Sequence, residues 1–539
     1  MIRAFALWVS VVALLTTNSC KNRNAVESKD ELFSYLDSLE RKYESACYSM
    51  GKANWNNYSG ESAPNLDGAK ARFARIFLDE QPRAVINEWR GKSASLADER
   101  LSRRLELWHR CFIGGSIYSD PEIAREENSL QKQITDFRFS FHGNAVTRAQ
   151  ISNRLREERD QRIRHDLWAV TGQLSSRARD NLIRLIKLRN ERARELGFNT
   201  YYSLSLYLHA IDEGWLLGVL RMLEEQTRPA FESFINASKR KLHVKKFHPW
   251  DFDIALRYAV SLPDNYFRSN SVFSTLHRFE KSLGFPVDSL PIKEYVKDIP
   301  YGGLSLAISI PNDSRFLVNP TKGKPFYEVA IHEYGHSLKA VYTRVEEPIL
   351  KGYEWIPGAQ CAAYEEGVAD LHKEFTDERK WLAVYTKAKP REIDKYIAGK
   401  GIPVLIRTRR LLKDFAVEYE LYKNPNQDAA ALERAMVKKY LMVDMDERDP
   451  HLFAANIWYT SYPCYFQNYI LAGMIATQLQ EALTNRFGEE KISNPMVSQW
   501  LIDHLYASGE LSEWTERIRE ATGKSLETGA YLRKLGIAE

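Results

Sequence analysis

The chain has 539 residues, of which 44% are hydrophobic and 27% are charged. This apolar fraction is large enough to bury a core, and it excludes a disordered or fibrous protein. The formal net charge is +5, from 76 Lys and Arg against 71 Asp and Glu. So small an excess in so long a chain argues against nucleic acid as a partner.

The first twenty residues have the composition of an export signal. Arg3 precedes an apolar run over residues 4–15, and a small, polar segment then leads to Cys20, which is typical of a secretory signal peptide. Its end resembles a bacterial lipoprotein signal, although Thr17 stands where that signal prefers Leu. We therefore expect a signal over residues 1–20 with Cys20 lipidated, a polar tether over 21–31, and export to the bacterial cell envelope, periplasm or outer membrane. Ordinary cleavage and an uncleaved anchor are the alternatives.

Four further cysteines are too far apart for a zinc knuckle or a CxxC redox site: Cys47, Cys111, Cys361 and Cys464. In an exported protein they are compatible either with buried free thiols or with a single Cys47–Cys111 disulfide.

From Asp30 to about Leu290, apolar residues recur at spacings of three and four, which predicts amphipathic helices. The pattern changes at residues 304–310, where Leu and Ile alternate with Ser and Ala. A Pro-Asn-Asp-Ser turn follows, and a second apolar run occupies residues 315–319. This arrangement predicts a β-hairpin in a mostly α-helical protein.

Directly after the hairpin, residues 331–336 read Ile-His-Glu-Tyr-Gly-His, an HExxH sequence. On a helix, His332 and His336 project from one face and can share a metal ion. Glu333 lies about 100° further round, within reach of a water on that ion. By itself the motif is moderately specific, because two helical histidines also occur in cores and on surfaces.

A catalytic zinc needs a third protein ligand, and a second helical segment over residues 361–375 offers one. Glu366 and Asp370 are four residues apart, so one carboxylate can bind the metal while the other supports a ligand histidine. Glu365 is expected to be the exposed acid of this helix.

HExxH followed by E-x-x-x-D resembles the gluzincin peptidases related to angiotensin-converting enzyme, and more distantly thimet oligopeptidase, oligoendopeptidase F and the Taq-type carboxypeptidases. Residues 53–77, 188–206 and 409–428 resemble the same group, and the first of these stretches favours the converting-enzyme branch. The resemblance implies one Zn²⁺ per chain, with Glu366 as third ligand and Asp370 behind it. It also implies a single domain over residues 32–539, a helical two-lobed body with a deep central cleft and the hairpin at its wall.

Residues 468–472 and 480–483 resemble the downstream helix of that branch, whose tyrosine hydrogen-bonds the oxyanion; Tyr469 occupies this position. Tyr462 and Tyr465 are expected to face the same cleft, and Ala307 on the hairpin strand is expected to bind substrate. Without the resemblance, a tyrosine stripe at helical spacing is more typical of a core.

The chain departs from the family at three places. Tyr459 stands where the family has a catalytic His, and the nearest upstream His is His451. The hairpin strand lacks the His of converting enzymes. Asn468 stands where a chloride-binding Arg is found, so chloride activation is not expected.

The resemblance implies zinc-dependent hydrolysis of peptide bonds in short peptides by a monomer that meets the membrane only through its lipid anchor. Glu333 would take a proton from a zinc-bound water and deliver it to the leaving amine. Release of C-terminal dipeptides, a peptidyl-dipeptidase activity, is the expected reaction, and oligopeptide endopeptidase is the alternative. Two further readings are a decayed peptide-binding envelope lipoprotein and a zinc hydrolase acting on cell-wall cross-links.

Overall fold

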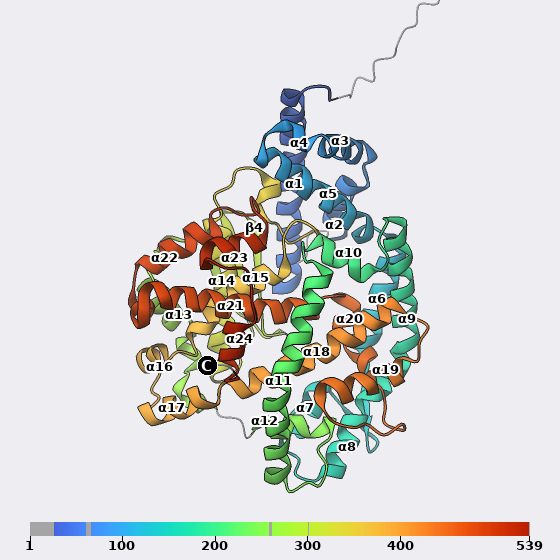
Figure 1. The fold of residues 1–539 in the computed structure, drawn as a ribbon, viewed down its shortest axis with the longest axis vertical. Coiled ribbons are helices and arrows are strands. Elements are labelled where there is room, and N and C mark those ends of the chain that lie inside the picture. Colours follow the sequence, from blue (N-terminus) through green and yellow to red (C-terminus); the bar gives the residue numbers. More distant parts are fainter. Residues whose placement is uncertain (1–25, 61–65, 258–260, 300, 538–539) are drawn as a thin grey trace, which may run out of the picture.

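The computed structural model describes residues 26–60, 66–257, 261–299 and 301–537. The predicted signal, Cys20 and the first part of the tether lie outside these residues. Most of the described chain is helical, as predicted, and the N-terminal helices form one end of the long axis (Figure 1).

The N-terminal end consists of α1 (Lys29–Ser59), α2 (Leu66–Leu78), α3 (Glu80–Gly91), α4 (Ser93–Leu96) and α5 (Glu99–Tyr118). Ser28 caps α1, because its hydroxyl accepts from the backbone N–H of Glu31 and the Glu31 carboxylate accepts from that of Ser28. The expectation of a tether through residue 31 is therefore wrong by three residues. These helices pack around Tyr43, Phe73 and Trp108, in a core that also takes in Ile310 and apolar residues of 345–359.

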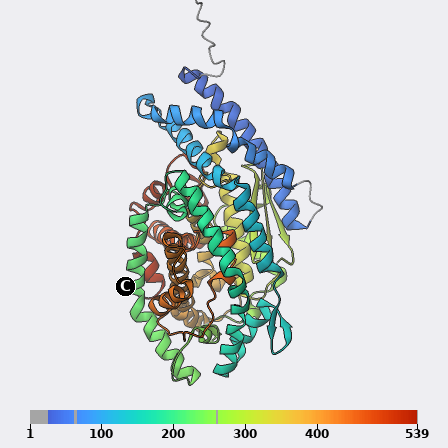
Figure 2. The same ribbon diagram turned by 90° about the vertical axis from the view of Figure 1, so that its right-hand side faces the viewer.

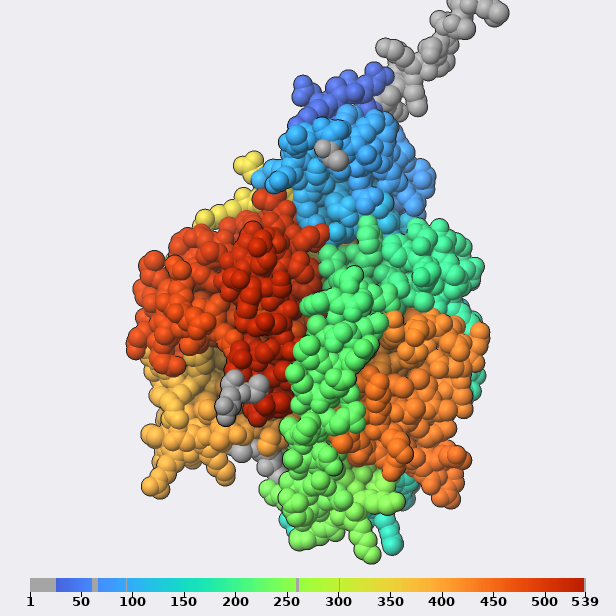
Figure 3. Space-filling view, viewed as in Figure 1, coloured from blue at the N-terminus to red at the C-terminus, as the bar shows by residue number. Residues whose placement is uncertain are grey.

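A second group of helices forms much of the main body. Its members are α6 (Pro121–Asp136), α7 (Arg148–Glu157), α8 (Gln161–Ala169), α9 (Thr171–Glu195), α10 (Tyr201–Leu208), α11 (Glu213–Leu242), α12 (Phe252–Arg257) and α13 (Val272–Ser282). On the face in Figure 3, α11 lies between the C-terminal segment in red and the segment around α19 in orange.

A short hairpin that the sequence reading missed interrupts these helices, with β1 (Phe139–Phe141) antiparallel to β2 (Asn144–Val146). Its turn is formed by His142 and Gly143, both with positive φ (49° and 78°), as two-residue hairpin turns require. The phenylalanines alternate in this stretch, but the run is too short to stand out among helical patterns.

The predicted hairpin at residues 304–319 is confirmed as β4 (Gly303–Ser309) antiparallel to β5 (Asp313–Val318). A third strand, β3 (Ile292–Val296), was not predicted; it runs parallel to β5 and gives the order β3-β5-β4. Strand β4 is thus an edge strand, and Figure 2 shows α1 lying beside the strands.

The rest of the chain is again helical: α14 (Lys324–Tyr342), α15 (Ala362–Phe375), α16 (Arg379–Tyr385), α17 (Pro390–Gly399), α18 (Gly401–Lys423), α19 (Ala429–Met436), α20 (Trp458–Ser461), α21 (Phe466–Phe487), α22 (Met496–Leu501), α23 (Trp514–Thr522) and α24 (Gly529–Lys534). Helix α15 packs between α14 and α21, and α14 also packs on β4 and β5. This sandwich of α14, α15 and α21 positions the candidate site.

The structure decides between the two alternatives for the cysteines. Cys47, Cys111, Cys361 and Cys464 are all buried and unbridged, so the free-thiol alternative holds. In the described ranges, no helix combines the length and the apolar character that a membrane crossing requires.

Candidate active site

Three predicted metal ligands come together where α14 meets α15. The Nε2 atoms of His332 and His336 lie 3.2 Å apart, and Oε2 of Glu366 lies 3.5 Å from Nε2 of His332. One ligand atom from each residue can be chosen so that all three lie within 4.8 Å of one another. Two helices far apart in the sequence thus supply one compact donor set.

The donor set fits a zinc ion. Ligands at 2.0–2.1 Å from a tetrahedral zinc are separated by roughly 3.3 Å, close to the spacing of the two imidazole nitrogens. Two imidazoles and one carboxylate are also the donor types that suit zinc. The two ring nitrogens thus lie at a spacing that suits a shared cation.

Glycines let the three helices of the site approach closely. A Cβ on Gly335 would lie 3.1 Å from Cα of Ala369, so α14 and α15 are in backbone contact between the two histidines. A Cβ on Gly367 would lie 2.7 Å from Cβ of Ile475, so α15 is equally close to α21. Each glycine weakens its helix by about 1 kcal/mol relative to alanine, and the close packing accounts for its presence.

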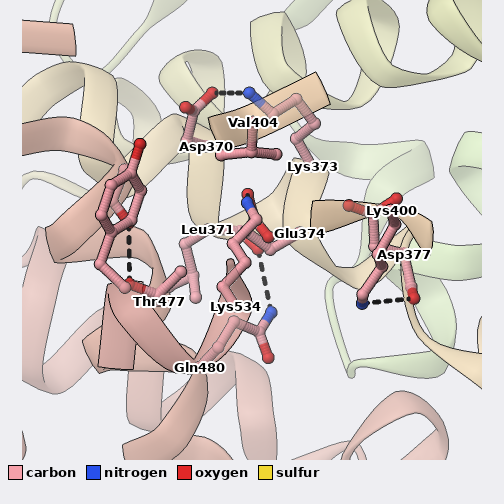
Figure 4. A network of polar contacts seen from close by, with 12 residues as sticks. Asp370, Leu371, Lys373, Glu374, Asp377, Lys400, Val404, Thr477, Gln480 and Lys534 are labelled. Carbon is pink, nitrogen blue, oxygen red and sulfur yellow. Dashed lines mark hydrogen bonds and ion pairs between the residues drawn. The ribbon is translucent and has the colours of Figure 1, made fainter. Parts of the chain in front are cut away.

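Asp370 supports the first histidine from behind. Its Oδ1 lies 2.8 Å from Nδ1 of His332 and 2.5 Å from Nζ of Lys373; Figure 4 shows the latter pair. Burial of Asp370 is outweighed by Lys373 and His332, which hold the pKa of the carboxyl well below its usual range. Burial also disfavours charged His332, but Asp370 outweighs it and raises the pKa of the imidazole. A carboxylate on the far nitrogen fixes the ring with Nε2 toward the donor set.

Further polar contacts anchor the C-terminal half of α15 (Figure 4). Glu374 forms an ion pair with Lys534 of α24, and the Gln480 side chain of α21 donates to the backbone oxygen of Leu371 at 3.1 Å. The Lys400 ammonium donates to the backbone oxygen of Asp377 at 2.9 Å. The C-terminal half of the helix that carries Glu366, and the turn after it, are therefore tied to α18, α21 and α24.

Glu333, the predicted general base, is 8% exposed. Strand β4 passes directly over it: a Cβ on Gly303 would lie 2.8 Å from Oε1 of Glu333, and the Ser305 N–H donates to the carboxylate. Burial, reinforced by the charge of Glu366, raises the pKa of Glu333 to about 7. A carboxyl with such a pKa can both accept and return a proton near neutral pH.

Aromatic side chains from residues 458–469, in α20, the start of α21 and the link between them, lie on the side of the third ligand. The Tyr465 hydroxyl donates to Oε1 of Glu366 at 3.1 Å, and the Tyr465 and Tyr469 rings are 5.3 Å apart. Trp458 contacts both rings and also Tyr462, which is 49% exposed. Burial, followed by the charge of Glu366, raises the pKa of Tyr469, so its hydroxyl stays protonated and able to donate.

Sequence reasoning missed two cations beside these residues. The guanidinium of Arg407 in α18 lies 5.4 Å from the ring centroid of Tyr469, and the charge of Lys373 acts on Glu366 as well as on Asp370. Arg407 belongs to no sequence motif. Its position next to α21 depends on how α18 packs in the folded chain.

Three other residues of the sequence analysis are also placed, and of these Glu365 lies differently from expectation. Glu365 is not the exposed acid: it forms an ion pair with Lys339 and lies near Glu510. The Ala307 side chain packs toward the core of α1–α5, so only its backbone is available on β4. Tyr459 is buried, with its hydroxyl 3.2 Å from Asp414, so it takes no catalytic position.

Two residues from the family departures are also placed. Nδ1 of His451 contacts the Ser175 hydroxyl at 2.8 Å, away from the donor set. The side-chain amide of Asn468 is fully buried, and neither its nitrogen nor its oxygen finds a hydrogen-bond partner within the described part of the chain.

Known metallopeptidases are similar to this chain. Residues 425–537 match the family model described as carboxypeptidase Taq (M32) metallopeptidase, a range with Tyr469 but without the HExxH helix. Oligopeptidase A of Salmonella typhimurium is 27% identical over 241 residues, 40% of this chain and 34% of that protein. Oligopeptidase A of Haemophilus influenzae is 22% identical over 430 residues, 66% of this chain and 61% of that protein. The chain thus spans between one third and two thirds of these relatives.

The fold has a solved counterpart. Trypanosoma cruzi metallocarboxypeptidase 1 superimposes with a TM-score of 0.64 at 15% identity, covering 93% of this chain and 98% of that one. The chain is thus similar to metallopeptidases in part of its sequence and to a metallocarboxypeptidase in its fold. Taq-type carboxypeptidases are among the more distant relatives expected from the sequence. The assignment to the converting-enzyme branch stays a prediction.

Proposed function

We propose that this protein is a zinc-dependent peptidase that trims short peptides from the C-terminus, with dipeptides as the expected product. The observation that carries the proposal is the donor set of His332, His336 and Glu366 with the buried carboxyl of Glu333 next to it. The similarity to carboxypeptidase Taq and Oligopeptidase A supports peptide substrates.

The residues divide the chemistry among them. His332, His336 and Glu366 would hold the zinc, which when bound supplies Lewis acidity toward a peptide carbonyl and a water. The Glu333 carboxylate accepts a proton from the attacking water and returns it to the departing amine. The Tyr469 hydroxyl donates a hydrogen bond to the oxygen that gains negative charge.

Arg407 supports action at the C-terminus. It is exposed, stacks on the ring of Tyr469 and has no carboxylate partner among the described residues. A guanidinium binds a carboxylate through two parallel hydrogen bonds, so Arg407 is suited to the terminal carboxylate of a peptide. Recognition of that group would place the last residues of the substrate beside Tyr469.

Internal cleavage of oligopeptides is the second candidate. It is favoured by the similarity to Oligopeptidase A and by the open edge of β4, whose backbone groups can pair with an extended peptide. An enzyme that relies on the strand edge alone would not need a free C-terminus.

One experiment separates these reactions. Wild type, Glu333→Gln and the control Glu346→Gln, an exposed site, are given nested peptides with free or amidated C-termini, and the products are identified by mass spectrometry. Each protein should bind about one zinc. We expect Glu333→Gln to lose at least about 10²-fold in rate and Glu346→Gln to match wild type.

Amidation should stop C-terminal trimming and leave internal cleavage intact. If the zinc-loaded wild type cuts no peptide, the peptidase proposal is wrong, and peptide capture or cell-wall hydrolysis takes its place.

We also propose export and lipidation at Cys20. Support comes from the basic, apolar and small segments of residues 1–20. Metabolic labelling with a fatty acid should mark the wild type and not Cys20→Ser; an unlabelled wild type would rule out the lipoprotein assignment.

A further inference from the structure

A basic groove lies between α1 and α2, with a volume of about 550 Å³. Arg41 and Lys42 line it from α1, and Arg72 and Arg75 line it from α2. It belongs to the N-terminal helices, and neither the three predicted zinc ligands nor Glu333 line it.

The charges of the groove are not compensated within the fold. No carboxylate lines it, and within the described ranges its four cations form no ion pair. Some other exposed cations do have partners, as in Lys92–Glu88 and Lys132–Asp136. The formal net charge of the whole chain is only +5, so the four positive charges in this groove are a local concentration of charge.

The charges of the groove repel one another by roughly a few tenths of a kcal/mol per pair. Arg72 and Arg75 are three residues apart on one helix, and like charges at this spacing destabilise the helix. An anion between α1 and α2 would remove the repulsion on both helices at once. A locally unfavourable charge pattern without compensation in the fold is typical of a functional surface.

The donor types indicate which anion fits. Guanidinium groups present planar pairs of N–H donors that match phosphate oxygens, and lysine adds a point charge. The hydroxyls of Ser38 and Ser45 line the same groove and can donate as well. Three arginines and hydroxyl donors favour a phosphate over a simple halide.

We propose that the α1–α2 groove binds phosphate groups, either of a soluble phosphate compound or of phospholipid headgroups. The predicted lipid anchor bears on the source, because Cys20 precedes the first residue of α1, Lys29, by nine residues. Nine extended residues span at most roughly 30 Å, so an anchored chain would hold α1 near the membrane surface.

The test uses the full chain with Cys20→Ser, so that no lipid anchor contributes. Inorganic pyrophosphate is titrated calorimetrically, and sedimentation is measured with phosphatidylglycerol–phosphatidylcholine vesicles and with phosphatidylcholine vesicles. Arg72→Gln/Arg75→Gln and, separately, Arg41→Gln/Lys42→Gln neutralise the groove from each helix. Lys239→Gln/Arg240→Gln removes two charges from another basic hollow, at the end of α11, as the matched control.

We expect each groove pair to weaken binding by about 10- to 30-fold, as the loss of two cations near an anionic surface predicts, and the control pair to change it less than twofold. Circular dichroism and peptide cleavage should be unchanged in all variants. Pyrophosphate binding would identify a soluble source, and binding only to anionic vesicles would identify headgroups. If wild type binds neither probe, or if the control pair weakens binding as much as the groove pairs, the proposal is wrong.

Discussion

Oδ1 of Asp370 lies 2.8 Å from Nδ1 of His332, one helix away, and the other nitrogen of the same ring faces His336 and Glu366. The carboxylate therefore determines which nitrogen of His332 is free to bind a metal. Since Lys373 contacts the same carboxylate oxygen, the carboxylate is itself held in place.

Removal of this support should weaken metal binding before it affects the fold. We expect Asp370→Asn to lower zinc affinity by about 10- to 100-fold, measured by competition with a chromophoric chelator. Asp136→Asn, on the exposed end of α6, is the control and should bind zinc as wild type does. Equal affinity in Asp370→Asn would show that the ring needs no orientation from Asp370.

Gly335 is the position where α14 and α15 touch. A methyl group there would lie 3.1 Å from Cα of Ala369, so Gly335→Ala must push the helices apart. We expect a loss of roughly 1–3 kcal/mol in the free energy of unfolding, together with weaker zinc binding. Gly218 in α11 has open space around it, and Gly218→Ala should instead stabilise the protein by up to about 1 kcal/mol. Denaturant titration distinguishes the two signs.

Arg407 should decide whether a free C-terminus is required. We expect Arg407→Gln to reduce kcat/KM on peptides with free C-termini by about 10- to 100-fold, the loss of one charge-assisted contact of 1.5–3 kcal/mol. The rate on amidated peptides should not change. A uniform loss on both substrates would mean that Arg407 acts on Tyr469 and not on the substrate.

Glu418 gives stability a defined pH dependence. It is fully buried, and burial raises its pKa to about 8 although the Cys464 N–H donates to it at 2.9 Å. The folded state therefore holds this proton at pH values where the unfolded chain has released it. The contribution of Glu418 to stability is fully present below the unfolded pKa near 4.5 and is lost as the pH rises toward 8.

Glu418→Gln should flatten this decline. We expect the variant to gain more than about 1 kcal/mol relative to wild type between pH 5 and pH 8, since one pKa unit corresponds to that energy. Free energies of unfolding at several pH values test this. Parallel curves for the two proteins would contradict the raised pKa.

The local part of the site could be predicted from sequence. The spacing of His332 and His336 is a property of one helix, and the alternation in residues 304–310 is a property of one strand. Both are short-range patterns, and both correspond to elements of the structure. The mostly helical fold followed from the same kind of periodicity.

Features that depend on contacts between distant segments could not be predicted from the sequence. Strand β3 pairs with β5 across some twenty residues, and its own five residues carry no distinctive alternation. Glu365 looked exposed because its partner Lys339 lies on another helix. Arg407 contacts Tyr469 only after α18 and α21 pack, so the sequence around neither residue predicts the contact.

The packing of α15 between α14 and α21 also sets the order in which the site can exist during synthesis. Glu366 needs α14 for its partner histidines and α21 for Tyr465. A nascent chain that ends before Phe487 lacks part of this assembly. The contacts of Glu366 with His332 on α14 and with Tyr465 beside α21 can therefore form only late, once most of the chain has been synthesised.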